Sequence, residues 1–189
     1  MKTTDVDRVL VDVDGTVCRN LPRVCEFVAR EYGVDISPAE ITEWRYEFER
    51  IDTRIDEVIA RLMTDHARWF LSGLEPVAGA RRGLEALADA GYERWVVTHR
   101  PAHTHRLTRQ WLDSHDIGYD HFVNDVPANK AEVPGDALVD DYHRNVHDAV
   151  EAGIIGVLFE RPYSEPVEHP RAVGVSTWSG VLDTLGVDC

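Results

Sequence analysis

The chain has 189 residues, of which 43% are hydrophobic, so it suits one globular domain with a small inserted module and is too apolar for a disordered chain. It carries 34 acidic against 20 basic residues, a net charge of −14, and such a surface repels nucleic acid backbones. Since no apolar run approaches the length that spans a bilayer, we expect no membrane partner.

The basic residues are unusual in kind. Only Lys2 and Lys130 are lysines, and the other basic residues are arginines. Excess carboxylate with almost no lysine is typical of halophilic proteins, in which salt screens the self-repulsion; the alternative is an ordinary acidic protein. In either case, a site for an anionic substrate needs local positive charge.

The cysteines and the first residues bear on the compartment. Cys18, Cys25 and Cys189 form no CxxC pair and no evenly spaced framework, which favours a reducing environment. The N-terminal residues alternate apolar positions with Asp, as a strand does, and show no signal-peptide pattern. We therefore expect a cytoplasmic protein.

The first predicted element is a buried strand over residues 8–13, RVLVDV, which runs into a glycine turn. Three helices are predicted next, over residues 22–32, 37–51 and 55–70. The second of them begins at SPAE, which offers an N-cap serine, a proline in the first turn and a capping-box glutamate. Residues 72–76, SGLEP, then break the helical pattern.

From residue 76 onward, helices and strands alternate. Such alternation predicts a doubly wound parallel sheet of the α/β class. The proline-rich residues 160–170 are predicted to form a loop. The predicted helices cover residues 80–90, 101–114, 145–152 and 179–185, and the predicted strands cover residues 95–97, 122–123, 137–139 and 154–159.

The three early helices interrupt this alternation directly after the first strand. We expect residues 19–75 to form a small helical cap over the carboxyl edge of the sheet, and residues 1–18 and 76–189 to form the core domain. In such sheets, ligands bind outside the carboxyl ends of the strands. The chemically interesting residues fall at those ends: Asp12, Asp14, Thr98, Asp140 and Asp141.

The strongest motif is DVDGT at residues 12–16. Asp12 and Asp14 are separated by one residue, so they leave the strand end on the same side, and Gly15 permits the sharp turn that follows. Carboxylates packed this closely repel each other unless a cation joins them, and Mg²⁺ prefers such oxygen ligands. The alternative is a plain strand followed by an Asp/Gly turn.

Four motifs make the chain similar to the haloacid dehalogenase-like (HAD) superfamily of phosphatases, which implies a Rossmann-like core with an inserted cap. The first motif of that superfamily, DxDGT, is specific, whereas the other three are weak alone and strong in series. They occur in the superfamily's order over nearly the whole chain. The matches are DVDGT, the strand-end Thr98, the basic Lys130, and the acidic pair Asp140-Asp141 with the polar Asn145 beyond it.

The resemblance implies a role for each matched residue. Asp12 attacks phosphorus and forms an aspartyl-phosphate, and Asp14 protonates the leaving alcohol and then takes a proton from water. Thr98 hydrogen-bonds a phosphoryl oxygen. Lys130 balances the charge on the phosphate and the carboxylates.

The resemblance also implies a Mg²⁺ cofactor, held by Asp12, by Asp14 through its backbone carbonyl, and by Asp141, with Asp140 as a fourth member of the metal site. Asp140 is expected to orient Lys130 or a metal-bound water. Two positions depart from the common pattern. Asn145 stands where many relatives carry another acid, and His99 and Arg100 stand where small residues are frequent, so these two either contact the substrate phosphate or cap the next helix.

Residues 73–80, GLEPVAGA, and the late Trp178-Ser179 resemble the 5'(3')-deoxyribonucleotidase-like branch of the superfamily. The expected substrate is therefore a small phosphorylated metabolite, with a nucleoside monophosphate favoured. The absence of lysine from residues 19–75 argues against Schiff-base phosphonate cleavage. The alternatives are a phosphotransferase or phosphomutase, and a non-catalytic binding protein of the same fold. Aromatic residues of the cap either stack on a base or fill the cap interior: Trp44, Tyr46, Phe48, Trp69 and Phe70.

Overall fold

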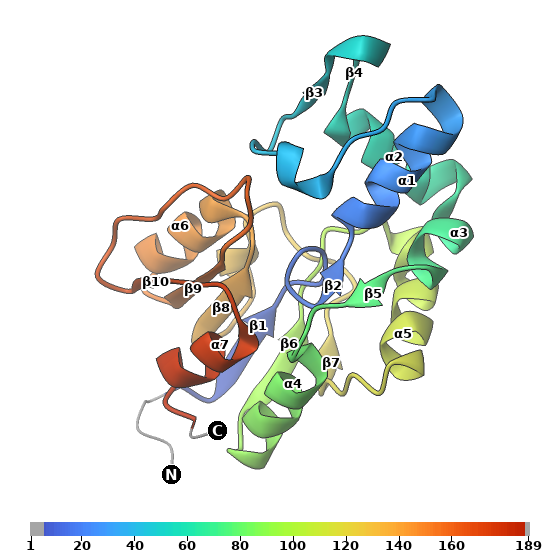
Figure 1. Ribbon diagram of the computed structural model, residues 1–189. Coiled ribbons are helices and arrows are strands. Elements are labelled where there is room, and N and C mark those ends of the chain that lie inside the picture. The colour runs from blue at the N-terminus through green and yellow to red at the C-terminus, as the bar shows by residue number, and fades with distance from the viewer. Residues whose placement is uncertain (1–5, 188–189) are drawn as a thin grey trace.

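A central sheet of six parallel strands organises the chain, in the order β10-β9-β8-β1-β6-β7 (Figure 1). The computed structural model describes residues 6–187, so Lys2 and Cys189 lie outside the described residues. The predicted α/β class with a doubly wound parallel sheet is confirmed. The strands are β1 (Arg8–Val11), β6 (Glu93–Val96), β7 (His121–Phe122), β8 (Ala137–Asp140), β9 (Ile155–Phe159) and β10 (Ala172–Val175).

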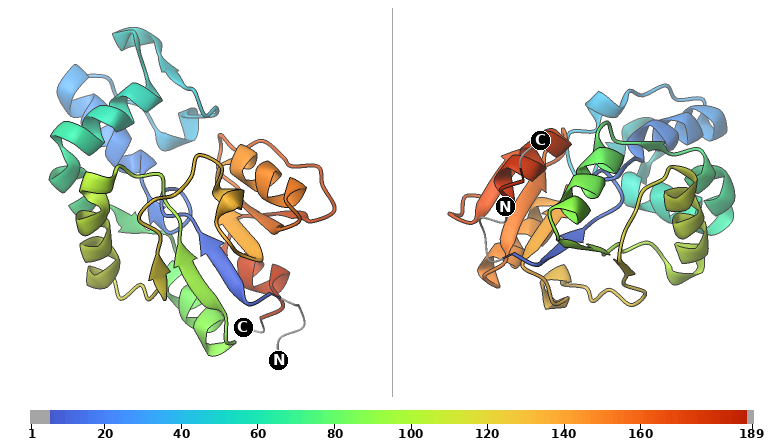
Figure 2. Two further views of the ribbon diagram at one scale, coloured as in Figure 1. Left: turned by 180° about the vertical axis from the view of Figure 1, so that it is seen from behind. Right: turned by 90° about the horizontal axis from the view of Figure 1, so that it is seen from below.

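Strand β1 lies between β8 and β6 and is apolar on both faces because helices cover both faces of the sheet (Figure 2). Leu10 belongs to the same core cluster as α6, whereas Val9 and Val11 belong to the larger cluster that contains α4 and α7. The alternation follows from the period of two along a strand. These helices are α4 (Ala80–Asp89), α6 (His143–Glu151) and α7 (Trp178–Thr184).

After β1 the chain makes an insertion that lies over the carboxyl end of the sheet (Figures 1 and 2). Strands β2 (Cys18–Arg19) and β5 (Glu75–Pro76) pair antiparallel, so the insertion leaves and rejoins the core at one place. We call the segment between these two strands the insertion. Its helices are α1 (Leu21–Tyr32), α2 (Ile55–Asp65) and α3 (Ala67–Ser72), and α3 also packs against the core helix α5 (His105–Ser114).

The helix predicted over residues 37–51 is wrong. Its capping box does form, because Ser37 Oγ accepts from Ala39 N at 3.2 Å and Glu40 Oε2 accepts from Ser37 N at 2.7 Å. The helical turn nevertheless ends at Glu40, as the 3₁₀ turn η1 (Pro38–Glu40). The following residues, TEWRY, are rich in β-branched and aromatic side chains with modest helix propensity. They pass through a bend and a turn at residues 43–45 into a hairpin of β3 (Glu47–Phe48) and β4 (Thr53–Arg54), whose strands are separated by the 3₁₀ turn η2 (Glu49–Ile51).

Other differences from the predicted elements are smaller. The third predicted helix is broken at His66, which separates α2 from α3. The helix predicted from Pro101 becomes α-helical only at His105, after the 3₁₀ turn η3 (Ala102–Thr104). Strand β10 was not predicted, because a short segment with a central Gly174 carries little strand signal and its pairing with β9 is a tertiary contact.

Two further expectations concern the compartment. Cys18 and Cys25 are both buried and free. Within residues 6–187, every helix is too short or too polar to cross a bilayer.

Candidate active site

Strands β1, β6 and β8 end side by side, and their register brings the sequence motifs together. Val11 pairs with Val96 on one side and with Val139 on the other, so Asp12, Thr98 and Asp140 follow at one edge of the sheet. A cavity of about 420 Å³ opens there between the sheet and the insertion. Every predicted site residue lines it: Asp12, Asp14, Thr98, His99, Arg100, Lys130, Asp140, Asp141 and Asn145.

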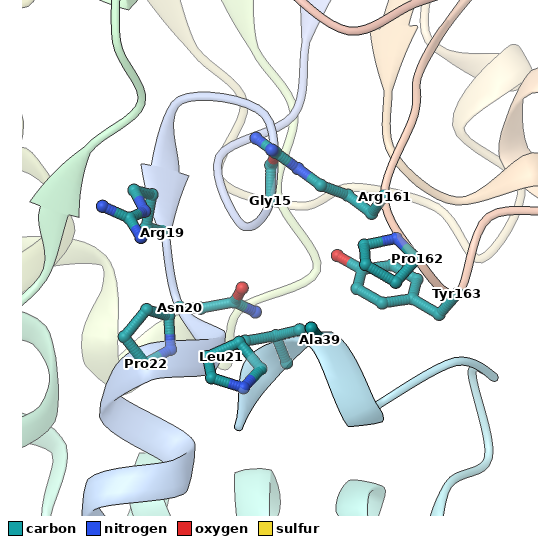
Figure 3. A pocket seen from close by; sticks show the side chains of 10 residues that line it. Gly15, Arg19, Asn20, Leu21, Pro22, Ala39, Arg161, Pro162 and Tyr163 are labelled. Atoms are coloured by element: carbon teal, nitrogen blue, oxygen red, sulfur yellow. The ribbon is translucent and has the colours of Figure 1, made fainter. Parts of the chain in front are cut away.

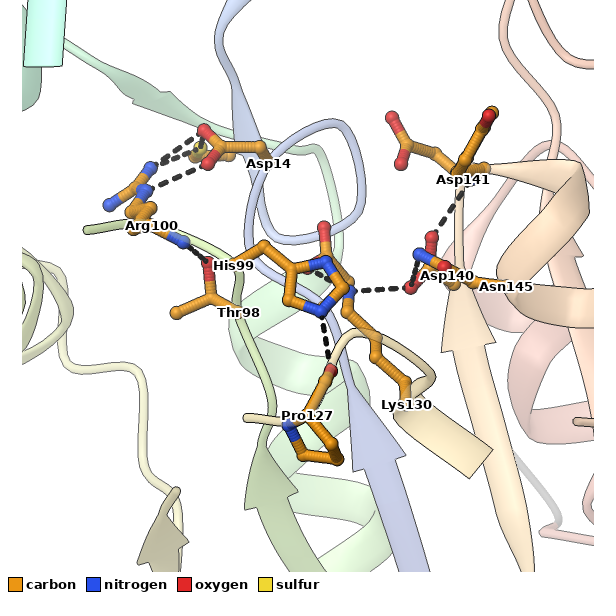
Figure 4. Close-up of polar contacts among 12 residues, drawn as sticks. Asp14, Thr98, His99, Arg100, Pro127, Lys130, Asp140, Asp141 and Asn145 are labelled. Carbon is orange, nitrogen blue, oxygen red and sulfur yellow. Dashed lines mark hydrogen bonds and ion pairs between the residues drawn. The ribbon is translucent and has the colours of Figure 1, made fainter. Parts of the chain in front are cut away.

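Lys130 bridges two carboxylates at the floor of the cavity (Figure 4). Its Nζ donates to Asp12 Oδ1 at 2.6 Å and to Asp140 Oδ2 at 2.7 Å, and the side chain is only 2% exposed. Burial alone would lower the pKa of this ammonium group, but the two carboxylates outweigh burial and raise the pKa. Lys130 begins the 3₁₀ turn η4 (Lys130–Glu132), where Asn129 Oδ1 caps the turn by accepting from Ala131 N. The lysine is therefore a fixed positive charge beside Asp12.

Asp140 holds this lysine in place. Its Oδ2 accepts from Lys130 and from Asn145 Nδ2, the latter at 3.0 Å, while its Oδ1 accepts from Tyr142 N at 2.9 Å. Because both oxygens already accept hydrogen bonds, Asp140 is better placed to orient Lys130 than to bind a cation. Asn145 supports the same carboxylate.

The carboxylate of Asp14 turns away from the acidic pair and meets Arg100 (Figure 4). Arg100 Nε donates to Oδ2 at 2.7 Å and Nη2 donates to Oδ1 at 2.8 Å, a bidentate pair in which the arginine side chain is 1% exposed. Burial would raise the pKa of Asp14, but the charge and hydrogen bonds of Arg100 outweigh it and lower the pKa. Arg100 also donates to Thr108 Oγ1 at 3.1 Å. The charged partner of Arg100 is therefore Asp14, which the sequence did not predict.

The carboxylates that line the cavity outnumber the positively charged side chains that line it. Asp12, Asp140 and Asp141 each offer a carboxylate oxygen, and these oxygens lie within 4.8 Å of one another. Burial and the neighbouring carboxylates raise the pKa of Asp12 to about 7 and raise the pKa of Asp141 above its usual range. Together with Asp14, four carboxylates face only Lys130 and Arg100 as fixed cations on the cavity wall. An all-oxygen site with two uncompensated charges fits a divalent cation such as Mg²⁺.

Thr98 and His99 occupy different parts of the cavity. Thr98 is buried, and its Oγ1 accepts from Arg100 N at 3.3 Å. His99 is exposed at the rim, where its Nε2 lies 2.9 Å from Pro127 O. The hydroxyl of Thr98 therefore lies deep in the cavity, and the imidazole of His99 lies near its mouth.

The insertion supplies the other wall of the cavity. Of the five aromatic residues considered for base stacking, only Trp44 and Phe70 line it. Tyr46 and Phe48 pack on each other with ring centroids 5.1 Å apart, and Trp69 lies under the guanidinium of Arg23. A second cavity of about 280 Å³ is largely apolar, and it shares lining residues with the first cavity: Asn20, Trp44, Ile59, Met63 and Pro101.

Sequence reasoning missed Tyr163, whose hydroxyl donates to Asp141 Oδ2. The residue stands in the proline-rich loop after β9, which carries no motif that points to the site. It also did not predict the burial of His105, whose Nε2 lies 2.9 Å from Arg100 O. The contact of Tyr163 joins two separate loops, which local patterns do not register.

The raised pKa values predict how the stability of the metal-free protein depends on pH. A folded-state pKa above the unfolded value stabilises the fold at low pH, and this stabilisation is lost as the pH rises through the folded pKa, which is about 7 for Asp12. In the presence of a chelator, we expect Tm to fall between pH 5 and 8. Added Mg²⁺ should restore it, with the larger gain at pH 8. Calorimetric scans measure both trends.

Asp12→Asn supplies the control for this prediction, because it removes one of the titrating groups. Its metal-free Tm should fall less steeply over the same range. Asp14, whose pKa is lowered, is ionised throughout this window in both states and adds no slope there. Identical pH slopes for the wild type and the variant would contradict the assignment.

Comparison with known proteins supports one family. The model of the family described as "5' nucleotidase, deoxy (Pyrimidine), cytosolic type C protein" matches residues 6–187. A Chlorobaculum tepidum protein described as "Putative 5'(3')-deoxyribonucleotidase" is 27% identical over 186 residues, which cover 93% of this chain and 88% of that protein. A Bacillus subtilis protein described as "Putative nucleotidase YqfW" is 24% identical and covers 90% of this chain and 89% of its own length.

Solved structures show the same fold. A crystal structure described as "Putative Phosphatase from Clostridium difficile" superposes with a TM-score of 0.66 at 17% identity, covering 97% of this chain and 100% of that chain. A HAD phosphatase from Thermococcus onnurineus superposes with a TM-score of 0.57 at 20% identity, covering 96% and 99%. At these sequence identities, the superpositions show that the chain has the HAD fold and nothing more.

Proposed function

Because the chain belongs to the family of cytosolic type C deoxy (pyrimidine) 5'-nucleotidases, and is a phosphatase of the HAD superfamily, we propose that it hydrolyses nucleoside monophosphates, with deoxyribonucleotides as the favoured class. The observation that carries the proposal is the position of Asp12. This buried carboxylate ends β1, is held by Lys130 at 2.6 Å, and lines a cavity large enough for a small substrate.

In the proposed reaction, Asp12 Oδ2 attacks phosphorus while Lys130 holds Oδ1. The bond from Asp12 to phosphorus forms as the bond from phosphorus to the leaving oxygen breaks, and Asp14 gives that oxygen its proton. A water then attacks the aspartyl-phosphate, Asp14 takes a proton from it, and phosphate leaves. The pairing with Arg100 favours the carboxylate form of Asp14, which the second half-reaction needs. In the first half-reaction, the proton that the leaving oxygen takes from Asp14 is supplied by the monoanionic form of the substrate phosphate.

Thr98 and Lys130 are the proposed phosphate ligands. The hydroxyl of Thr98 is buried in the cavity, and the charge of Lys130 would offset the negative charge that builds up on the phosphoryl group. His99, at the rim, is the candidate for contact with the remainder of the substrate. Arg100 acts on the substrate only through Asp14.

The proposed cofactor is Mg²⁺, held by Asp12, Asp141 and the backbone carbonyl of Asp14. When bound, the ion would neutralise the nucleophile and the phosphate together. The excess of buried carboxylate over fixed positive charge supports this assignment.

We further propose that residues 19–75 act as a cap on a core of residues 1–18 and 76–189, and that the cap receives the leaving group. The apolar second cavity, reached past Trp44, offers a surface on which a base could stack. Since caps exclude water and select the substrate, the lining of this cavity would set the choice of base.

A substrate panel in Mg²⁺ tests the proposed function. We expect release of inorganic phosphate from deoxynucleoside monophosphates with a kcat/KM at least about tenfold above that for sugar phosphates, because the apolar cavity favours a planar base. Product nucleoside formed without matching inorganic phosphate, in the presence of an alcohol acceptor, would instead indicate phosphotransfer. No turnover by folded, Mg²⁺-loaded protein on any of these esters would favour the binding-protein alternative.

The surroundings of the enzyme are also part of the proposal. The two buried free cysteines support a reducing, cytoplasmic compartment. The net charge of −14 with only two lysines supports a protein adapted to high salt. The substrate panel is therefore best run at both low and molar KCl.

A further inference from the structure

Asp141 is held by one loop through both its side chain and its backbone. Tyr163 donates its hydroxyl hydrogen to Asp141 Oδ2, and Ser164 Oγ donates to Asp141 O at 2.8 Å. A tyrosine hydroxyl is protonated at neutral pH, so it acts as a donor to the carboxylate. A donor at one carboxylate oxygen fixes the rotation of the group and leaves the other oxygen for a cation.

The same loop also contacts the turn that follows Asp12 (Figure 3). Arg161 reaches Gly15, where its Nε donates to the carbonyl oxygen at 2.7 Å. Gly15 adopts a φ of +76°, and a Cβ at this position would collide with the carboxylate of Asp141 and approach the Tyr163 hydroxyl. The loop therefore packs closely against both acidic segments of the site.

Trp44, a side chain of the insertion, contacts two tyrosines next to Asp141: Tyr142, which follows it in the chain, and Tyr163, which donates to its carboxylate. Trp44 stacks on Tyr142 with ring centroids 3.9 Å apart and planes 20° apart. It also meets Tyr163 edge-on, with centroids 5.5 Å apart. Trp44 is nevertheless 43% exposed, so the insertion is not held there by deep burial. Among the described residues, this stack links the turn after η1 to the residue that follows the acidic pair Asp140-Asp141.

We propose that Tyr163 is a positioning residue for Asp141, and that Trp44 acts on Asp141 by positioning Tyr163 when the insertion lies against the core. The affinity of the site for its cation then depends on where the insertion lies, although Trp44 itself does not bind the cation. This inference rests on the proposed magnesium site, and it adds two residues that no HAD motif contains.

The test measures Mg²⁺ binding directly, by titration calorimetry on the full chain, so it does not depend on turnover. Tyr163→Phe keeps the ring and removes the hydroxyl, and we expect the Kd for Mg²⁺ to rise about tenfold. Trp44→Leu should raise it about threefold to tenfold. The Kd of the double variant for Mg²⁺ should lie within about twofold of the Kd of Tyr163→Phe, because Trp44 acts through Tyr163.

Matched controls separate positioning from loss of stability. Tyr92→Phe removes another buried tyrosine hydroxyl, which donates to Leu185 O at 2.7 Å at a site remote from the cavity. Trp69→Leu removes another tryptophan of the insertion, one that packs on Arg23. Both should lower Tm while leaving the Kd for Mg²⁺ unchanged.

The following results would overturn the proposal. Unchanged or tighter Mg²⁺ binding by Tyr163→Phe would show that the hydroxyl is structural or competes with the ion. Fully additive losses in the double variant would show that Trp44 does not act through Tyr163. A wild-type protein that binds no Mg²⁺ would overturn this inference together with the proposed metal site, whereas wild-type binding unaltered in the variants would overturn this inference alone.

Discussion

Asp12→Asn is expected to lower kcat for phosphate release by at least about 10³-fold, because the amide cannot form the aspartyl-phosphate and no nearby carboxylate replaces it. Asp140 is occupied by Lys130 and Asn145, and Asp14 by Arg100, while Asp141 accepts from Tyr163 and is a proposed ligand of the cation. The fold should survive, since the substitution is isosteric and removes a buried carboxylate whose ionisation destabilises the metal-free protein. Steady-state kinetics with saturating Mg²⁺ measure the loss, and calorimetry at pH 8 measures the stability.

Asp136→Asn is the matched control. Asp136 precedes β8 at the opposite end of the sheet, where its Oδ2 accepts from Arg8 N at 2.8 Å. Its loss should lower Tm slightly and leave kcat unchanged. A fully active Asp12→Asn protein would remove the nucleophile from the proposed reaction.

Lys130→Met is expected to have the largest effect on stability. The substitution leaves the buried carboxylates of Asp12 and Asp140 without their shared cation, and breaking a buried ion pair from one side costs about 3–5 kcal/mol. Activity should also fall by about 10²-fold or more, since the charge opposite the phosphoryl group is lost. Denaturant unfolding gives the free energy, and kinetics on the folded fraction give the activity.

A second substitution separates these two effects. Lys130→Met combined with Asp140→Asn removes one of the unpaired carboxylates, so the double variant should regain part of the lost stability without regaining activity. Arg94→Met breaks a more exposed ion pair with Asp120 and should cost only about 1 kcal/mol. Equal costs at Lys130 and Arg94 would contradict the view that the lysine is a buried, fully engaged charge.

The two predictions probe different aspects of one electrostatic arrangement. Lys130 compensates part of the negative charge at the end of β1, and Arg100 compensates the charge of Asp14. The remaining charge on Asp12 and Asp141 is what the proposed cation would neutralise. In the absence of metal, Asp12→Asn removes a carboxylate and so lowers the repulsion among the buried negative charges. Lys130→Met removes a cation and so raises that repulsion. The two variants should therefore change the free energy of unfolding in opposite directions.

The sequence by itself determined the parts of this protein that local patterns encode. A buried apolar run followed by DVDGT predicts a strand ending in paired carboxylates, and the alternation after residue 76 predicts the parallel sheet. Since carboxyl ends of parallel strands meet at one edge, the order of the motifs was sufficient to bring Asp12, Thr98 and Asp140 to one cavity. Lys130 was identified by its resemblance to the third motif of the HAD superfamily.

Only the tertiary structure decided which partner each of these groups meets. Arg100 pairs with Asp14 across 86 positions of the chain, and Tyr163 pairs with Asp141 across 22. The segment that begins at η1 shows the same limit: its capping box formed, yet the helical turn ends at Glu40, and Trp44 in the turn that follows stacks on Tyr142 of the core. Periodicity and capping act over a few neighbouring residues, whereas these contacts depend on how separate elements pack, and packing is a property of the whole fold.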